Sequence, residues 1–135
     1  MRKLLFFTMM LFIGSLVMKA QTASFSSAPG NVPSFHWLTD STIAVGSVEL
    51  NKPVNVTFEF VNSGKAPLVI SKVEPSCGCT AVEYSKEPIA PGQKGFVKTT
   101  YNAASVGVFN KTVTVFSNAA DMRKILNIKG EVVGR

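Results

Sequence analysis

The sequence predicts an all-β domain, an immunoglobulin-like antiparallel β-sandwich of about seven strands. From Ser41 onward, short apolar stretches alternate with turn residues, which is typical of antiparallel sheet. Over the same region no stretch shows the 3.6-residue period of an amphipathic helix. The chain has 135 residues, of which 46% are hydrophobic, so it is long enough for one domain with a core of its own.

The strands are expected in chain order. We expect them at residues 43–50, 54–60, 68–73, 81–84, 96–101, 109–116 and 123–133. The second strand shows the clearest pattern, because Val54, Val56, Phe58 and Phe60 alternate with polar residues. Such alternation predicts one buried and one solvent-facing side.

Turn residues separate these strands. The sequence Asn62-Ser63-Gly64 ends the second strand, and a Pro- and Gly-rich segment precedes the strand at 96–101. In that segment Pro91 fixes φ at a corner position and Gly92 accepts a positive φ, which predicts a tight turn.

The N-terminus has the pattern of a secretion signal. A short basic start is followed by an apolar run from Leu4 to Val17, which is too short for a membrane-spanning helix. We expect residues 1–20 to be a signal peptide cleaved after Ala20, residues 21–40 to be a lead-in segment, and residues 41–135 to be the Ig-like domain. An uncleaved membrane anchor is the alternative. The aromatic end of the lead-in, from Phe35 to Leu38, precedes the expected sandwich and is expected to dock on it.

The charge pattern argues against nucleic-acid binding. The whole chain has a formal charge of +6, but loss of Arg2, Lys3 and Lys19 with the signal leaves eleven basic residues against eight acidic ones. The remaining lysines are scattered singly, without the basic stripe that follows a phosphate backbone.

An ordered series of motifs resembles a known family. These are Val61-Asn62-Ser63-Gly64, Pro67-Leu68-Val69-Ile70, Ser76-Cys77-Gly78-Cys79-Thr80, Pro88-Ile89-Ala90-Pro91-Gly92, Gly107-Val108-Phe109-Asn110-Lys111 and Ser117-Asn118. On these residues the chain resembles the domain-of-unknown-function family 1573, secreted bacterial Ig-like domains related in pattern to the ASPM, SPD-2 and Hydin domains and to major sperm protein. The resemblance covers roughly residues 43–133.

The resemblance implies an Ig-like sandwich outside the cytoplasm and no settled biochemical activity. Members of such families often have an Asp-Phe-Gly element on the first strand, and Ala44-Val45-Gly46 stands there in this chain. Any role that the aspartate has in those families therefore cannot be assigned to a residue of this chain.

Cys77 and Cys79 are the two cysteines of the chain and form the strongest candidate site. Along an extended strand their Cα atoms would lie about 6.6 Å apart, near the upper limit for a disulfide, so Gly78 would have to bend the chain. Closing so small a ring contributes only about 1.6 kcal/mol on the loop-entropy model. The pair could be a local disulfide that is easily reduced, a redox-active thiol pair, a metal clip or packed neighbours.

Other chemistry has few candidate residues. A tetrahedral zinc site would need two ligands besides the thiolates, and the expected mature chain offers only His36 and Met122. Copper(I) accepts fewer ligands, so Cys77 and Cys79 could bind it. His36 is the sole histidine, with no prepared nucleophile nearby in sequence. We therefore expect no catalytic residues and no cofactor.

These observations predict a non-enzymatic protein exported to the periplasm or cell surface of a Gram-negative bacterium. It would bind or support an envelope protein or other macromolecule through its sheet edges and its cysteine loop. Nucleic acid and a stable membrane span after signal cleavage are not expected. The alternative is a periplasmic thiol-redox or copper(I)-binding protein that uses Cys77 and Cys79.

Overall fold

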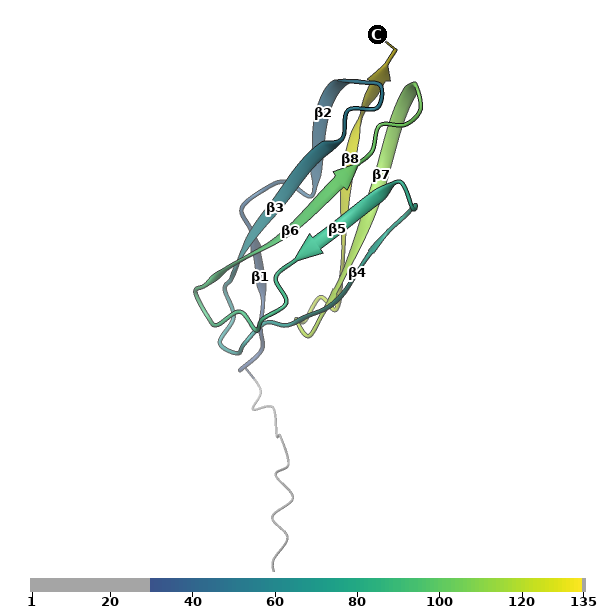
Figure 1. Ribbon diagram of the computed structural model, residues 1–135. Helices are drawn as coiled ribbons and strands as arrows, with labels where there is room; N and C mark the ends of the chain where they lie inside the picture. Colours follow the sequence, from purple (N-terminus) through teal and green to yellow (C-terminus); the bar gives the residue numbers. More distant parts are fainter. Residues whose placement is uncertain (1–29, 135) are drawn as a thin grey trace, which may run out of the picture.

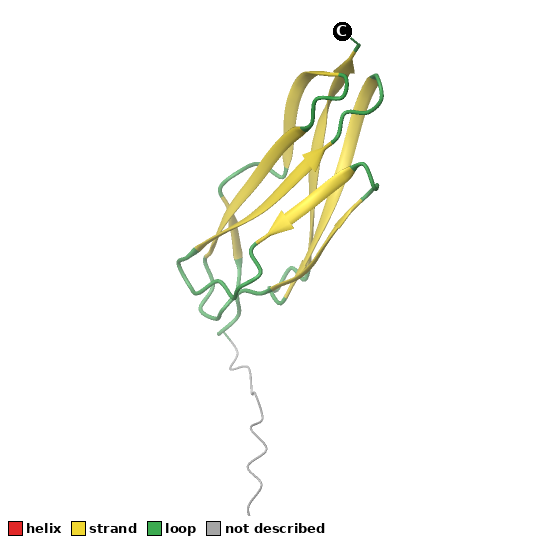
Figure 2. Cartoon of the chain, in the orientation of Figure 1, coloured by secondary structure: helices red, strands yellow, loops and turns green. Residues whose placement is uncertain are grey.

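The computed structural model describes residues 30–134, and these residues form strands and loops (Figures 1 and 2). The expected signal peptide, residues 1–20, and residues 21–29 of the expected lead-in lie outside the described residues. The strands are β1 (Phe35–Trp37), β2 (Thr42–Glu49), β3 (Val54–Asn62), β4 (Ile70–Pro75), β5 (Thr80–Tyr84), β6 (Lys94–Tyr101), β7 (Gly107–Ser117) and β8 (Arg123–Val133). Within residues 30–134 no helix has the length and apolarity needed to cross a bilayer.

The strands form two four-stranded sheets packed face to face. The first sheet has the order β1-β3-β6-β5 and the second has the order β2-β8-β7-β4 (Figure 1). The all-β, Ig-like sandwich predicted from the sequence is confirmed, and each of the seven expected strands is present. The strand expected at residues 123–133 has the predicted bounds, and the other six differ at one or both ends. Strand β1 is additional.

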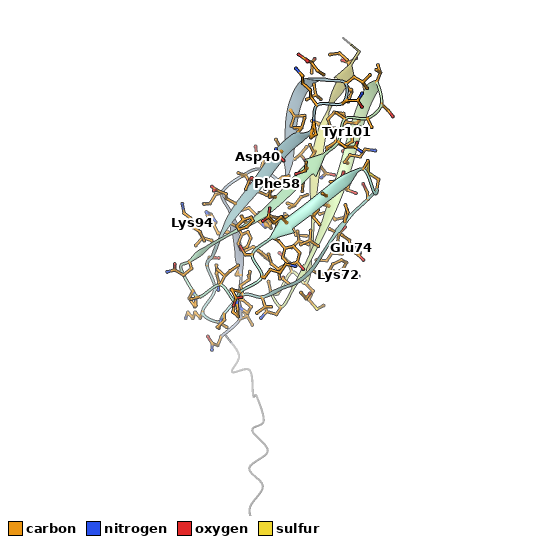
Figure 3. The ribbon with its side chains drawn as sticks, in the orientation of Figure 1. Asp40, Phe58, Lys72, Glu74, Lys94 and Tyr101 are labelled. Carbon is orange, nitrogen blue, oxygen red and sulfur yellow. A yellow bond between two sulfur atoms is a disulfide. The ribbon has the colours of Figure 1, made fainter. Side chains whose placement is uncertain are left out.

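Alternating side chains build the core between the sheets. Along β3 the side chains of Val56, Phe58 and Phe60 are buried and those between them are exposed, as the sequence pattern predicts. The opposite sheet contributes fully buried residues such as Leu126 and Ile128. Figure 3 shows the side chains of both sheets, with Phe58 in the interior and Lys72, Glu74 and Lys94 on the outside.

Strand β1 lies within the segment that we expected to lead into the domain. It pairs antiparallel with β3, so that Trp37 faces Phe60 across the ladder. The rings of Phe35 and Trp37 both pack on Phe60, with centroids 4.8 and 5.1 Å away. Aromatic packing against a buried ring explains why this segment joins the first sheet.

One strand pair departs from the expected antiparallel arrangement. Strand β2 runs parallel to β8, from Thr42 beside Asn127 to Glu49 beside Val133. The chain leaves β2 for the first sheet at the end where β8 also finishes, and Leu50 N–H donates to the Val133 carbonyl there. Both strands must therefore run in the same direction. A register shift between Ala44 and Gly46 interrupts the pair, and Gly46 has a φ of +72°.

The predicted turn before β6 is confirmed. Gln93 N–H donates to the Ala90 carbonyl at 3.0 Å, and Gly92 has a φ of +80°. This geometry places glycine where a positive φ is needed. The turn also contacts β3, because Gly92 N–H donates to the Asn62 carbonyl at 2.7 Å.

Candidate functional site

The two cysteines lie where the chain crosses from one sheet to the other. Strand β4 is an edge of the second sheet and β5 is an edge of the first. The connection from Ser76 to Cys79, with Thr80 after it, is called the disulfide corner below; it is the teal turn at the right of Figure 1. The site therefore lies beside two sheet edges.

A disulfide joins Cys77 and Cys79, and their Cα atoms are 5.3 Å apart. A turn shortens this separation from the extended value, since Thr80 N–H donates to the Cys77 carbonyl at 3.3 Å. Gly78 is exposed and does not have a positive φ, and a Cβ atom built on it would meet nothing within 4 Å. The bend therefore does not depend on the conformational freedom that we expected Gly78 to supply.

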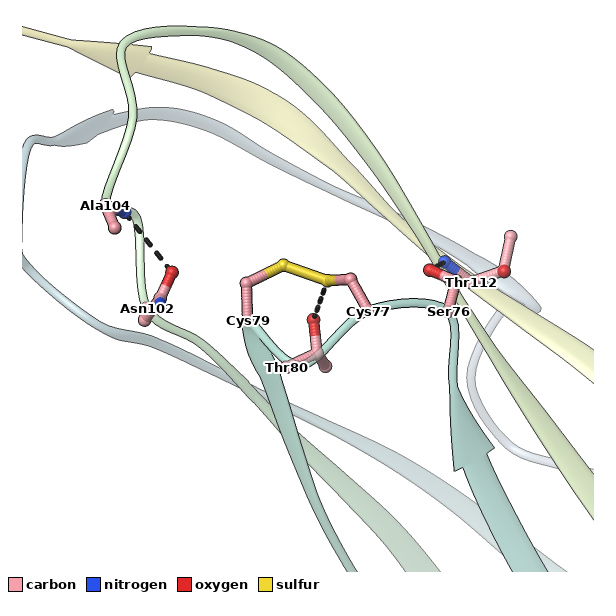
Figure 4. The surroundings of a disulfide bond; sticks show 7 residues. All are labelled: Ser76, Cys77, Cys79, Thr80, Asn102, Ala104 and Thr112. Carbon is pink, nitrogen blue, oxygen red and sulfur yellow. Dashed lines mark hydrogen bonds between the residues drawn. A yellow bond between two sulfur atoms is a disulfide. The ribbon is translucent and has the colours of Figure 1, made fainter.

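Hydrogen bonds anchor both ends of the corner, and Figure 4 shows the bond between Thr112 and Ser76 at one of them. On the side of the second sheet, Ser76 N–H donates to the Thr112 carbonyl at 2.8 Å, and Thr112 N–H donates to Ser76 Oγ at 3.1 Å. On the side of the first sheet, Asn102 N–H donates to the Cys79 carbonyl at 3.1 Å. Backbone and side-chain hydrogen bonds therefore hold both ends of the corner in addition to the sulfur–sulfur bond.

The two sulfur atoms have different surroundings. Cys79 is half-buried and packs against the core, whereas Cys77 is half-buried without being part of that packing. Cys77 Sγ lies 3.6 Å from Thr80 Oγ1, and the Thr80 side chain is buried (Figure 4). A buried hydroxyl at this distance can donate a hydrogen bond to Cys77 but has no such contact with Cys79.

The other predicted ligands lie away from the corner. His36 is on β1, which forms the opposite edge of the first sheet from β5. Met122 lies beside Ser117 on β7. Ser117 is five residues along this strand from Thr112, which bonds to Ser76 of the disulfide corner, and five strand residues span about 17 Å. The described residues contain no group of three or more His, Cys, Asp or Glu side chains placed to hold a metal ion. In the disulfide form neither sulfur is a thiolate, so a copper(I) site would require prior reduction.

Strand β5 has the most regular pairing among the four edge strands of residues 30–134. It has five residues in continuous register with β6. Strand β1 has only three residues, and β2 carries the irregularity at Gly46. Strand β4 has a register shift near Ser71 and ends at Pro75, which has no N–H to donate. Bulges and prolines are usual protections of a sheet edge, and β5 has neither; its five residues make it longer than β1 but shorter than β2 and β4.

The backbone groups of β5 alternate in direction. The Cys79 carbonyl accepts a hydrogen bond from Asn102 N–H, just after β6, and Ser85 N–H donates to the Phe96 carbonyl on β6. By the alternation of an antiparallel ladder, Ala81 and Glu83 also face β6. The N–H and C=O groups of Val82 and Tyr84 therefore point to the open side.

A comparison with protein families matches residues 37–132 to the model described as "Protein of unknown function (DUF1573)". The chain belongs to the DUF1573 family. The resemblance drawn from the sequence motifs is thereby confirmed. The sequence matches no curated protein.

Solved structures similar to this DUF1573 chain share its fold. A crystal structure of a protein of unknown function from Porphyromonas gingivalis W83 has a TM-score of 0.67 at 13% identity; the match covers 80% of this chain and 51% of that one. This chain thus spans about half the length of that protein. The ASH/PapD-like domain 7 of human CEP192 has a TM-score of 0.59 at 10% identity; the match covers 83% of this chain and 92% of that one. The Vibrio cholerae VesB protease has a TM-score of 0.56 at 17% identity; the match covers 76% of this chain and 32% of that one. At these identities the likeness concerns the fold alone.

A second surface feature of the DUF1573 domain is a shallow depression of about 400 Å³ on the second sheet. It is lined by Ala44, Gly46, Ser47, Val108, Lys129, Gly130 and Glu131. Lys129 and Glu131 are exposed, and every buried polar side-chain atom of the described residues has a hydrogen-bond partner. The depression therefore offers no buried group held ready for a ligand.

Thr80 and Asn102 were not among the site residues predicted from the sequence of this DUF1573 chain. Thr80 follows Cys79 directly, and a hydroxyl residue next to a cysteine pair was the available signal for a sulfur contact. Asn102 is 23 residues from Cys79 in sequence, and only the pairing of β5 with β6 brings the two together.

Proposed function

We propose that this protein is a non-enzymatic, exported binding module that takes up an extended segment of a partner protein along the open edge of β5. The single observation that carries the proposal is the regular edge of β5, which has no bulge and no proline and lies beside the disulfide corner. An added strand would accept and donate main-chain hydrogen bonds at Val82 and Tyr84. The partner is an envelope protein with a segment free to become extended.

Side chains on β5 would limit which segments fit. The Glu83 side chain is exposed with its carboxylate 3.9 Å from Lys98 Nζ, and Lys86 Nζ lies 4.6 Å from the centre of the Tyr84 ring. A partner strand would therefore lie beside charged side chains of both signs and one half-buried aromatic ring. This favours a segment of alternating polar and apolar residues over a uniformly charged one.

The absence of enzymatic activity is part of the proposal. It is supported by the separation of the sole histidine from the cysteine pair, at opposite edges of the first sheet. A Cys–His nucleophile requires the two side chains within hydrogen-bond reach of each other. His36 is too far along the sheet to activate either sulfur.

Export is proposed from the N-terminal signal pattern, and a disulfide agrees with an oxidising compartment. It is tested by fractionating cells that produce the full chain and measuring the intact mass of the recovered protein. We expect it in the periplasm or on the cell surface, with a mass that corresponds to a chain beginning at Gln21. A cytoplasmic protein with an intact N-terminus would overturn this part of the proposal.

The binding edge is tested by photo-crosslinking in intact cells. Benzoyl-phenylalanine replaces Glu83 on β5 or, as a matched control on another edge, Ser47 on β2. We expect a discrete crosslinked partner from position 83 and none from position 47. Adding Val82→Pro removes one outward N–H and should reduce the crosslink about tenfold.

Two further variants separate edge pairing from general damage. Val82→Ala loses side-chain packing but keeps the N–H, and Ala44→Pro removes an outward N–H on β2. Both should retain the crosslink from position 83. Equal crosslinking from both edges, no crosslink from position 83, or insensitivity to Val82→Pro would contradict binding along β5.

A further inference from the structure

The disulfide corner differs from a structural cross-link in two respects. It closes a ring of only three residues, and hydrogen bonds from Thr112 and Asn102 already hold both of its ends. Closing a small ring in a frame that is fixed by other contacts adds little to stability. The bond is also partly exposed to solvent, since Cys77 and Cys79 are both half-buried and Gly78 is exposed. Exposed disulfides are typically the ones that undergo exchange.

The surroundings of the two sulfur atoms assign them different roles. Cys79 packs against the core, so the approach of a second molecule is easier at Cys77. Thr80 Oγ1 is 3.6 Å from Cys77 Sγ and can donate a hydrogen bond to a thiolate formed there. A stabilised thiolate is the better leaving group in thiol–disulfide exchange.

We propose that Cys77 and Cys79 form a redox-active couple that oxidises a dithiol, with Cys77 as the exchanging sulfur and Cys79 as the internal one. This chemistry goes beyond the binding function proposed above and does not require it. Each protein molecule oxidises one dithiol and is itself reduced, so the step is stoichiometric and is compatible with the absence of enzymatic turnover proposed above. The substrate class is a pair of thiols close enough to form a disulfide with each other, as in a small-molecule dithiol or a polypeptide with two neighbouring cysteines.

The exchange takes two steps. A substrate thiolate attacks Cys77 Sγ, the Cys77–Cys79 bond breaks, and Cys79 leaves with the electron pair and takes up a proton. The second substrate thiol then loses its proton and attacks the substrate sulfur of the mixed disulfide. Cys77 leaves as a thiolate that accepts a hydrogen bond from Thr80 Oγ1 and is then protonated. The substrate becomes a disulfide, and two electrons and two protons pass to the cysteine pair.

Accessibility of the bond is tested on protein expressed from the full chain and purified with the disulfide intact. The protein is equilibrated with excess reduced glutathione, quenched with acid, alkylated and weighed by intact mass. We expect more than about half of the molecules to carry two alkylated cysteines, as an exchange-active disulfide should. If fewer than about one tenth of the molecules carry two alkylated cysteines, the bond resists reduction by glutathione and the proposal is overturned.

The roles of the two sulfurs are tested with single-thiol variants and 5,5′-dithiobis(2-nitrobenzoate) at neutral pH. Cys79→Ser leaves Cys77 free, and Cys77→Ser leaves Cys79 free. We expect Cys77 to react about tenfold faster or more, because it combines access with a higher thiolate fraction. Equal rates, or a faster Cys79, would overturn the assignment.

The contribution of Thr80 is tested in the Cys79→Ser background. Thr80→Val keeps the buried volume and removes the hydroxyl, so the rate at Cys77 should fall about threefold to tenfold and its pH profile should move to higher pH. Thr80→Ser restores a hydroxyl and should recover most of the rate. In the Cys77→Ser background Thr80→Val should leave the Cys79 rate unchanged. A rate at Cys77 that does not respond to Thr80→Val, or an equal fall at Cys79, would show a merely structural role for Thr80.

Discussion

Asn62 is a fully buried polar residue whose side chain makes four hydrogen bonds. Its Nδ2 donates to the carbonyls of Ala66 and Ile89, both at 2.8 Å, and its Oδ1 accepts from the N–H groups of Ser34 and Gly64. One side chain thus connects the start of β1, the turn after β3 and the segment before β6. Removing it would leave several backbone groups without partners inside the protein.

We expect Asn62→Ala to lower the free energy of unfolding by about 3 kcal/mol, because a buried polar group that loses its partner costs about 1–3 kcal/mol. Urea unfolding followed by tryptophan fluorescence measures this change through Trp37. Asn55→Ala is the control, since Asn55 is exposed and accepts one bond from Thr100 Oγ1. Equal losses for the two variants would contradict the role given to Asn62.

Gly95 is a second residue whose identity is required by packing. A Cβ atom at this position would lie 2.4 Å from Phe60 Cζ and 2.6 Å from Ile89 Cδ1, and both side chains are buried. We expect Gly95→Ala to cost about 1–3 kcal/mol of stability through overpacking, measured by urea unfolding. Gly78→Ala, where a Cβ would meet nothing, should stay within about 0.5 kcal/mol of the unchanged protein. The reverse ranking would show that the local packing differs from this description.

At the scale of the elements, β1 completes the first sheet. Phe35 and Trp37 cover Phe60, and Gly64 lies so close to residues 32–34 that a Cβ on it would be 2.3 Å from the Val32 carbonyl oxygen. The segment that begins at residue 32 therefore belongs to the packed structure. Residues 21–29 of the lead-in lie outside the described residues.

Two truncations test this. A chain that begins at residue 30 should unfold at the same urea concentration as one that begins at residue 21. A chain that begins at residue 40 should unfold at a clearly lower urea concentration, because Phe60 becomes exposed and Asn62 loses Ser34 as a partner. Intrinsic tyrosine fluorescence or circular dichroism follows all three chains. If the chain from residue 40 were as stable as the others, β1 would be dispensable.

For the whole molecule, stability comes from the core shared by the two sheets. The buried hydrophobic side chains come from β3, β4, β6, β7 and β8 and from the loops between them, whereas the disulfide links residues two positions apart. A three-residue ring contributes at most about 1.6 kcal/mol on the loop-entropy model.

We therefore expect reduction with tris(2-carboxyethyl)phosphine to lower the free energy of unfolding by less than about 2 kcal/mol. The fold should be retained, as measured by circular dichroism with the reductant present throughout. The double variant Cys77→Ser with Cys79→Ser should behave like the reduced protein. Unfolding on reduction would identify the bond as a major structural cross-link.

Local patterns predicted much of this architecture. The alternation in β3 placed Phe58 and Phe60 in the core, and Pro91-Gly92 predicted its turn, because both signals depend on residues close together in the chain. The same patterns were weaker for β1, where three residues offer too little alternation to indicate a strand.

The sequence by itself determined the all-β class, the positions of seven strands and the nearness of Cys77 to Cys79, because each follows from spacing along the chain. Only the tertiary structure decided which strands are edges, that β2 runs parallel to β8, and that β1 joins the first sheet. It also placed His36 at the opposite edge from the cysteines and Asn102 beside Cys79. These features depend on pairing between residues far apart in sequence, where the order in which strands assemble sets the neighbours.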